Sequence, residues 1–188
     1  MHNLTKAEKT QMRILKAATK EFSTFGIAGA RVDRIAEQAK ANKSLIYNYF
    51  GNKEKLFEAV LKYHLDDVYK SVPFNAYDLP EYAANLFESA MDHPYLMKLV
   101  MWNGLEPEHT WPLGEDLSLE KQTIAIHEQQ VNGTISSDYK AEFILTVILT
   151  MASAWTDANP FGKSILSNPE NHRSTLKKLI YSLVKSMI

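Results

Sequence analysis

The sequence of 188 residues contains no cysteine, which excludes disulfide bonds, thiolate nucleophiles and cysteine zinc sites. Its longest uncharged apolar run, from Phe143 to Trp155, covers 13 residues. Such a run is too short to span a bilayer but long enough for a buried or interface helix. No apolar segment follows the early charges, so a secretory signal is not expected. These absences predict a soluble cytoplasmic protein with no membrane partner.

Signatures of enzymatic and metal sites are also missing. The six histidines are scattered, and no HExxH pattern or His/acid cluster has the spacing of metal ligands. The segment Gly162-Lys163-Ser164 is similar to the end of a phosphate-binding loop, but position 157 is Asp where that loop requires its first glycine. No nucleophile, base and acid are spaced as a set. We therefore expect no enzymatic activity, no cofactor and no metal site.

The chain has almost no net charge, at -1, but its basic and acidic residues are unevenly distributed. Residues 1–70 carry thirteen Lys and Arg against eight Asp and Glu, a net of +5, whereas the remainder carries eight against fourteen, a net of -6. A basic front and an acidic back suggest that only the front meets a polyanion. Modest imbalance is common on solvated surfaces, so this observation gains weight only beside a DNA-binding pattern.

Apolar side chains recur at helical spacing through almost the whole chain, and no strand pattern appears. The first helix should keep Ile14, Ala18, Phe22 and Phe25 on its buried side, and the glycines that follow should break it. Another break is expected in the segment NPFGKSILSNP, before the last helix. The fold class is therefore all-α, with helices expected over 5–24, around 32–39, around 43–50, from 53 to about 70, 81–92, 95–106, about 115–130, about 138–157 and 169–187.

The stretch from Ile35 to Lys53, IAEQAKANKSLIYNYFGNK, predicts a short helix, a tight break, a second short helix and the capped start of a third. At about 100° per residue, the second helix separates its side chains into two nearly opposite sides. One side is apolar, and the other offers a cation, a hydroxyl, a phenol and an amide, which can reach base edges and phosphates in a major groove. The pattern predicts a helix-turn-helix DNA-binding domain, with Lys43, Ser44, Tyr47 and Asn48 outward and Leu45, Ile46, Tyr49 and Phe50 packed.

The region TKAEKTQMRILKAATKEFSTFGIAGARVDRIAEQAKANKSLIYNYFGNKEKLFEAV resembles the N-terminal domain of TetR-type (tetracycline-repressor-like) transcriptional regulators. The RILKAATKEFSTFG opening, the RIAEQA helix, the LIYNYF helix and the NKEKLF start of the next helix agree in order and spacing. The rest of the chain is similar only in length and helical layout. The resemblance implies a homodimer with a small DNA-binding domain and a larger all-α effector domain. It also implies repression that a small molecule controls, commonly of efflux, catabolic or stress genes.

By this resemblance, the DNA-contacting residues divide into two kinds. Lys43, Ser44 and Asn48 are candidates for base edges, since Lys donates to guanine and Asn pairs bidentately with adenine. Tyr47 and Lys53 occupy positions that hold phosphate in the family, and Lys53 lies near a helix N-terminus, which favours anions. The alternative for each is an ordinary solvated side chain. The full set of candidates is Arg31, Lys40, Asn42, Lys43, Ser44, Tyr47, Asn48 and Lys53.

The sequence departs from the family pattern at two positions. The turn usually contains glycine, but here Lys40 occupies it. A left-handed backbone at Lys40 would cost about 1 kcal/mol; alternatively the turn is rearranged, or Lys40 is kept to contact a phosphate. The helix that starts at Val32 usually follows a Thr or Ser cap, and here Arg31 stands before it. A lost cap would weaken this helix by about 1 kcal/mol, and Arg31 could compensate by binding the DNA backbone.

The chain is expected to divide after its first third. Pro73 and Pro80 bracket a predicted linker, SVPFNAYDLP, at which the chain should change domain. By function, we assign residues 1–52 to the helix-turn-helix domain and 53–188 to the effector-binding and dimerisation domain, with a linking helix over about 53–70. The second part is rich in large soft side chains that could line a cavity for an apolar or aromatic effector. The candidates are Tyr82, Leu86, Met97, Met101, Trp102, Trp111, Phe143 and Trp155, although each is more often core than ligand contact.

The last two predicted helices each carry a wide apolar stripe. Two such helices from each subunit could bury one another as a four-helix bundle, which would suit a dimer reading a palindromic duplex. A plain intramolecular core remains the alternative. The stripes are Ala141, Ile144, Leu145, Ile148, Leu149, Ala152 and Trp155 on one helix, and Leu176, Leu179, Ile180, Leu183, Val184 and Met187 on the other.

We therefore predict a ligand-responsive, dimeric transcriptional regulator, with repression preferred. Activation or repression depends on where the operator lies, which no residue encodes. The runner-up is a helical small-molecule-binding or scaffold protein without specific DNA binding, which the altered turn at Lys40 favours. An all-α enzyme is a distant third. For the preferred reading, a transcriptional regulator, the expected partner is double-stranded DNA with a palindromic operator.

Overall fold

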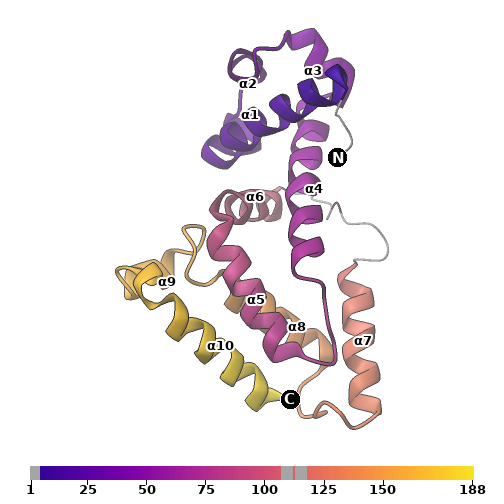
Figure 1. The fold of residues 1–188 in the computed structure, drawn as a ribbon, viewed down its shortest axis with the longest axis vertical. Coiled ribbons are helices and arrows are strands. Elements are labelled where there is room, and N and C mark those ends of the chain that lie inside the picture. Colours follow the sequence, from indigo (N-terminus) through magenta and orange to yellow (C-terminus); the bar gives the residue numbers. More distant parts are fainter. Residues whose placement is uncertain (1–4, 107–111, 113–117) are drawn as a thin grey trace. The chain divides into compact units, whose positions relative to one another are not determined.

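The computed structural model describes residues 5–106, 112 and 118–188, except for the side chain of Lys163. Every regular element in these ranges is a helix, as the sequence predicts (Figure 1). None of the described helices combines the length and the apolar character that a membrane crossing requires. The elements are α1 (Lys6–Gly29), α2 (Val32–Ala39), α3 (Lys43–Phe50), α4 (Lys53–Ser71), α5 (Leu79–Asp92), α6 (Pro94–Leu105), α7 (Leu119–Val131), α8 (Ala141–Ser153), α9 (Pro160–Ile165), the 3-10 helix η2 (Pro169–His172) and α10 (Arg173–Met187).

The chain forms two compact units, and the boundary between them falls inside α4 and again at the start of α6. The segment between α4 and α5 is not helical, as predicted for the linker, although Pro80 itself lies in the first turn of α5. Our division after residue 52 separates the DNA-binding and effector-binding functions, not compact units, and stays a prediction. The first unit comprises the described residues up to Leu65 and those from Lys98 to Pro112; the second comprises those from Asp66 to Met97 and from 118 to the end.

Helix α1 begins with a capping box. The backbone N–H of Glu8 donates to the Thr5 hydroxyl, and the Glu8 carboxylate accepts from the Thr5 N–H at 2.7 Å, so two N–H groups at the helix start are satisfied. The helix is kinked at Gly26, which has φ +67°. It therefore extends to Gly29, beyond the predicted end, with the expected break inside it. The predicted buried positions Ile14, Ala18 and Phe22 are all in the core.

Phe25 was predicted to be buried with these three, and this prediction is wrong. Its ring is 47% exposed, because the kink at Gly26 follows immediately and changes the direction of the helix. The guanidinium of Arg34 lies over the ring instead, 4.4 Å from the ring centre, in a cation–π arrangement. Phe22 packs edge-to-face against Phe57 in the core of the first unit.

Helix α4 begins where the sequence predicts. The side-chain oxygen of Asn52 accepts the N–H of Lys55 at 2.8 Å and caps the helix. His64 is half-buried, with its Nε2 atom 2.9 Å from the Thr19 hydroxyl of α1. The buried side of the helix is formed by Leu56, Phe57, Val60, Leu61, Leu65 and Val68.

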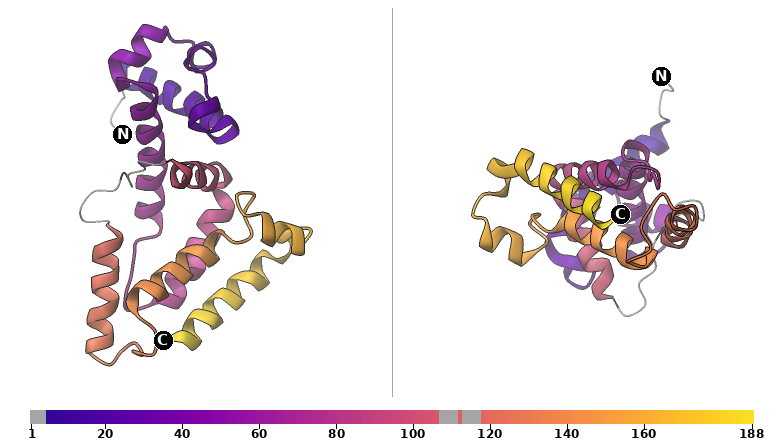
Figure 2. Two further views of the ribbon diagram at one scale, coloured as in Figure 1. Left: turned by 180° about the vertical axis from the view of Figure 1, so that it is seen from behind. Right: turned by 90° about the horizontal axis from the view of Figure 1, so that it is seen from below.

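In the second unit, α5 packs against both α8 and α10, and α7 packs against α8. The three helices α5, α8 and α10 lie side by side in Figure 1 and again from behind in Figure 2. Phe87 of α5 meets the indole of Trp155 edge-to-face, and Phe74 meets Tyr82 in the same way. The core of this unit is formed by Leu79, Tyr82, Ala83, Phe87, Ile126, Ile135, Ala141, Ile144, Leu145, Ile148, Ala152, Leu176, Ile180 and Val184.

The segment expected only to break the chain contains helix α9. Pro160 occupies its first turn, where a missing N–H costs nothing, and the Asn159 side chain accepts the N–H of Phe161 at 2.9 Å. The last helix also begins later than predicted, because residues 169–172 form the 3-10 helix η2 before α10 starts at Arg173. The prediction missed both elements because prolines marked breaks there, although proline is also favoured at a helix start.

The apolar stripes predicted for dimerisation are largely intramolecular core. Trp155 lies beyond the end of α8, and Leu179 and Leu183 of α10 are 59% and 50% exposed. A stripe wider than one packing face cannot all be buried by one neighbour, so its edge remains exposed. The buried members are Ala141, Ile144, Leu145, Ile148 and Ala152 on α8, and Leu176, Ile180 and Val184 on α10.

Candidate nucleic-acid interface

The turn between α2 and α3 keeps a tight geometry although it lacks glycine. Lys40 adopts φ 48° and ψ 47°, the left-handed conformation that ends α2. Its N–H donates to the carbonyl of Glu37, and the N–H of Ala41 donates to the carbonyl of Ala36 at 3.0 Å, so the end of the helix is satisfied. The first of our alternatives for Lys40 is therefore confirmed, and the turn is not rearranged. The turn is therefore kept despite the replacement, so the altered residue gives little support to a protein without specific DNA binding.

The start of α2 has no cap from its own preceding side chain, as expected from Arg31. A carboxylate from α1 takes that role instead. Oε1 of Glu21 accepts the backbone N–H of Arg31 at 2.8 Å and the Nε–H of Arg34, also at 2.8 Å. Glu21 is only 1% exposed, and its carboxylate is paired with the half-buried side chain of Arg34, as a buried carboxylate requires. The guanidinium of Arg34 also donates to the carbonyl of Gly29 at 3.1 Å.

Helix α3 separates its side chains as the sequence predicts. Ile46 is buried, and Leu45, Tyr49 and Phe50 are half-buried. Asn42 caps the helix, because its side-chain oxygen accepts the N–H of Ser44 at 2.7 Å. This cap explains why Asn42 stands here without assigning it a DNA contact. The four outward residues Lys43, Ser44, Tyr47 and Asn48 are all exposed.

Lys43 does not extend freely into solvent. Its Nζ atom lies 2.8 Å from Oδ1 of Asp33, so an ion pair joins α3 to the first turn of α2. Both side chains are exposed, at 48% for Lys43 and 62% for Asp33. The hydrogen bond from Lys43 holds the pKa of the Asp33 carboxyl below its ordinary value, and the same bond raises the pKa of Lys43. The pair is therefore ionised at neutral pH.

The candidate set contains three further cations, Arg31, Lys40 and Lys53. Arg31 and Lys40 are exposed, at the start and end of α2. The charge of Arg31 also lowers the pKa of Asp33, after the larger effect of Lys43. Lys53 lies in the first turn of α4, and its Nζ atom donates to the carbonyl of Ala28 at 3.4 Å. One long hydrogen bond leaves the other donors of its ammonium available to an anion.

The described residues proposed to line an effector site belong to both units and differ in burial. Tyr82 is buried in the core of the second unit, and burial raises its pKa above the ordinary range. Trp102 packs against Gly26 in the first unit. Trp111 lies outside the described residues. Of the others, Leu86 packs at the edge of the core, Met97 is half-buried, Met101 is 51% exposed, and the exposed Phe143 stacks on Tyr139.

Trp155 borders a hollow of about 280 Å³ within the second unit. The apolar residues that line it are Ala90, Met91, Pro94, Trp155 and Pro169. Asp157 and Glu170 line it too, and the Glu170 carboxylate also forms an ion pair with Arg173 of α10. A second hollow, of about 420 Å³, lies where α7 and α8 meet and is bordered by His127, Gln130, Val131, Ser137, Tyr139, Lys140, Ala141 and Glu142.

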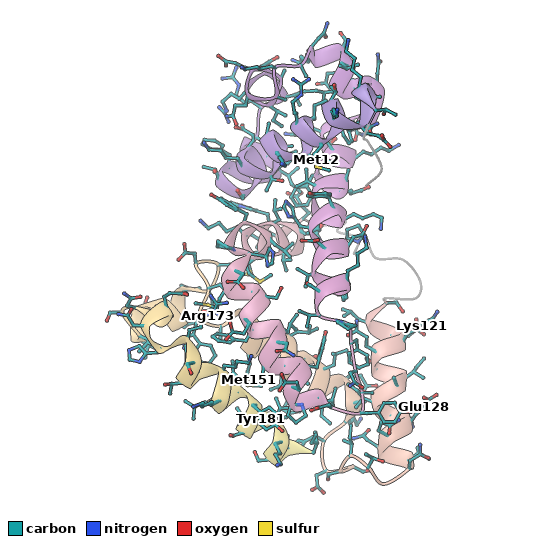
Figure 3. All side chains as sticks on the ribbon, in the orientation of Figure 1. Met12, Lys121, Glu128, Met151, Arg173 and Tyr181 are labelled. Carbon is teal, nitrogen blue, oxygen red and sulfur yellow. The ribbon has the colours of Figure 1, made fainter. Side chains whose placement is uncertain are left out.

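Sequence reasoning missed three ionic residues around these sites. From the sequence we assigned no role to Asp33 or Glu21, whose partners Lys43 and Arg34 lie ten and thirteen residues away. We assigned none to Arg173 either. It forms ion pairs with Glu88, Asp92 and Glu170, and it joins the start of α10 to the end of α5 (Figure 3). No local spacing indicates any of these contacts.

Two family models match the chain in succession. Residues 14–60 match the model described as "Bacterial regulatory proteins, tetR family". Residues 78–185 match the model described as "Tetracyclin repressor-like, C-terminal domain". The first match covers α2, α3 and most of α1, and the second covers the helices from α5 to α10.

Known proteins resemble the chain, some over nearly its full length and others over its first third. The HTH-type transcriptional repressor SCO4008 of Streptomyces coelicolor is 35% identical over 185 residues, which covers 94% of this chain and 96% of that protein. The HTH-type transcriptional repressor NicS of Pseudomonas putida is 51% identical, but over only 57 residues, 30% of this chain and 27% of that protein. A solved structure, of the putative transcriptional regulator SCO4942 from Streptomyces coelicolor, has a TM-score of 0.79 at 27% identity and covers 95% of this chain and 97% of that one. With its helix-turn-helix exposed and both family models matched, the chain belongs to the TetR family and is a DNA-binding transcriptional regulator.

Proposed function

We propose that this regulator is a cytoplasmic repressor that binds a palindromic operator as a homodimer and leaves it when a small molecule binds. The observation that carries the proposal is the outward side of α3, where four polar side chains are exposed together on a helix that a tight turn positions. Helices of this kind enter a major groove and contact base edges near their N-terminus. The similarity to proteins named as repressors supports the direction of regulation.

The candidate contacts divide between base and backbone. Asn48 offers an amide that pairs bidentately with adenine, and Lys43 and Ser44 offer donors for base edges. Tyr47 and Lys53 are assigned to phosphates, together with Arg31 and Lys40. Phosphate contacts fix the register of the protein on the duplex, while base contacts select the sequence. Asn42 is assigned to capping α3, with contact to DNA as a secondary role.

Dimerisation is proposed through α10, with α8 beside it. Leu179 and Leu183 are four residues apart, so they lie on one side of α10, and both are at least half exposed. Large apolar side chains exposed on adjacent turns are typical of an interface. The buried members of both stripes support this surface from inside the subunit. Two copies related by a two-fold axis present two copies of α3 to successive major grooves.

The effector is proposed to be apolar or aromatic and to bind in the second unit. The hollow beside Trp155 and Met91 supports this, because an indole and a thioether provide polarisable walls. Its volume of about 280 Å³ suits a small ligand. Asp157 and Glu170, which also line the hollow, would favour a ligand that carries no negative charge. A ligand there stabilises the state to which it binds more tightly.

The test is selection of bound sequences from a randomised duplex pool with purified full-length protein at near-physiological salt. One palindromic motif is the expected result, and its position in the genome indicates the regulated genes and the direction of control. A pool without enrichment, at several protein concentrations and in the absence of any effector, would contradict specific DNA binding. Enrichment of a single half-site without its mirror image would contradict binding as a dimer.

A further inference from the structure

The ion pair between Asp33 and Lys43 lies on the surface that the proposed function assigns to DNA. Asp33 is in the first turn of α2, and Lys43 is the first residue of α3. Their contact of 2.8 Å therefore joins the two helices of the helix-turn-helix at their N-terminal ends. In this motif the N-terminal residues of the second helix contact base edges, and the first helix crosses the DNA backbone. The contact with Lys43 therefore holds the Asp33 carboxylate of α2 beside the base-contacting end of α3. Both side chains stay exposed, so the pair is accessible to a duplex.

The two partners retain hydrogen-bonding capacity beyond their contact. An ammonium has three N–H donors and a carboxylate has about four acceptor sites, so one mutual bond leaves donors on Lys43 and acceptors on Asp33. The pair thus presents a donor group beside an acceptor group, in a fixed order. In the major groove, guanine offers O6 and N7 as acceptors, and its partner cytosine offers the N4 amino group as a donor. The two patterns are complementary.

We propose that Asp33 is a specificity-determining residue and that the Asp33–Lys43 pair recognises one G·C base pair in each half-site. Lys43 donates to O6 or N7 of guanine, and Asp33 accepts from N4 of the cytosine on the opposite strand. This inference rests on the proposed function, because it requires α3 to enter a major groove. Asp33 is thereby added to the DNA-contacting residues, although it is acidic and was not among the candidates.

Electrostatics favours this role over a simple charge effect. An isolated carboxylate near the phosphates would repel them, but Asp33 is neutralised by Lys43 and lies in the field of Arg31. Because the pair is nearly neutral, it adds little to counterion release. Its contribution is therefore selectivity, and the overall affinity for DNA depends on the unpaired cations. The ionised state of Asp33 at neutral pH keeps both carboxylate oxygens available as acceptors.

The test compares selections from a randomised duplex pool for the unmodified protein, Asp33→Ala, Lys43→Ala and Glu37→Ala. Glu37 is the matched control, because it is an exposed acid on the same helix outside the ion pair. We expect Asp33→Ala to retain the motif except at one G·C pair per half-site, where discrimination falls about fivefold to a hundredfold. Lys43→Ala should relax the same base pair, and Glu37→Ala should leave the motif unchanged.

An isosteric variant guards against loss of folding. Asp33→Asn keeps the shape and one oxygen, but its amide pairs best with adenine, so the selected base should change from cytosine towards adenine. Thermal unfolding of each variant verifies that it is folded. The inference is overturned if Asp33→Ala and Asp33→Asn keep the full motif and merely bind all duplexes more tightly, as Glu37→Ala would. It is also overturned if Lys43→Ala relaxes a different base pair. If the unmodified protein selects no motif, the proposed function fails, and this inference fails with it.

Discussion

A Cβ atom added to Gly26 would lie 2.8 Å from Cε3 of Trp102. The indole of α6 thus packs directly on the bare backbone at the kink of α1, within the first unit. Gly26 also has φ +67° with ψ -177°, a conformation that is essentially restricted to glycine. Two independent requirements therefore select glycine here: the backbone conformation and the space taken by the indole. The sequence indicated a break at Gly26 and a ligand contact at Trp102, and their packing together was not foreseen.

Replacing Gly26 by alanine is the first prediction. The variant should lower the free energy of unfolding by about 2–4 kcal/mol, since both backbone strain and overpacking against Trp102 contribute. Chemical denaturation measures this change. When Trp102→Ala has already removed the indole, adding Gly26→Ala should lower the free energy of unfolding only by the backbone strain, because the overpacking is relieved.

Two other glycines serve as controls for this substitution. Gly133 has φ +74° but no atom within 4 Å of an added Cβ, so Gly133→Ala incurs only the backbone strain, about 1–2 kcal/mol. Gly104 lies in α6, also has no atom within 4 Å, and has no positive φ, so Gly104→Ala should stabilise by about 0.5–1 kcal/mol. Equal losses at positions 26 and 133 would show that the indole contributes nothing.

Lys40→Gly should stabilise the protein, because glycine adopts the left-handed conformation of this turn without steric cost. The expected gain is about 0.5–1 kcal/mol, since the greater freedom of glycine in the unfolded chain offsets part of the relief. Thermal unfolding should show a rise of about 1–4 °C. If Lys40 also binds phosphate, the same variant weakens binding to every duplex. Unchanged affinity with raised stability would remove Lys40 from the DNA-contacting set.

Lys53 and Asn48 should behave differently when each is replaced by alanine. Lys53→Ala is expected to weaken binding to all sequences and to reduce the salt slope by about one for each subunit, because one phosphate contact is lost. Asn48→Ala should cost about 1–3 kcal/mol at one base position and relax the preference there. Titrations on operator and random duplexes at several salt concentrations separate the two. Equal loss on both duplexes for Asn48→Ala would contradict direct base recognition.

Arg173→Met should loosen the joint between α5 and α10. The guanidinium donates to the Glu88 carboxylate at 2.8 Å, to the Glu88 carbonyl at 3.0 Å and to Asp92 at 2.7 Å. The acidic partners are partly exposed, so the expected loss of stability is only on the order of 1–2 kcal/mol. Arg173→Lys should recover less than half of it, since an ammonium lacks the planar fork. Full recovery by lysine would show that only the charge matters.

Leu179→Glu should convert the dimer to a monomer, because it places a charge on the proposed interface while leaving the core of the subunit intact. Analytical ultracentrifugation measures the mass. Ile124→Glu is the matched control, since Ile124 is 51% exposed on α7 and lies outside the proposed interface. A variant at Leu179 that remains dimeric would contradict the assignment of α10. Loss of the dimer should also abolish binding to a palindromic duplex at concentrations that saturate the unmodified protein.

Local patterns predicted most of the helices and the two sides of α3, because helical spacing and caps such as Asn52 depend on residues within one or two turns. They missed α9 and η2, where proline stands at a helix start. Predictions failed where the outcome depends on distant packing. Phe25 fitted the apolar spacing but lies outward beyond the kink. The stripe on α10 was recognised, yet spacing alone could not separate buried Ile180 from exposed Leu179. The ion pairs of Asp33 and Arg173 join separate helices, and a linear sequence does not indicate them.

The carboxylate of Glu21 has a consequence for building chimeric regulators. Since it satisfies the N–H of Arg31, the residue just before α2, and pairs with Arg34, the recognition module does not begin at α2. A transplanted segment of residues 31–50 would leave its first helix uncapped and its guanidinium without a counter-ion. The smallest segment that carries its own supports therefore starts at α1, and exchange of operator preference between relatives should be attempted with that whole segment.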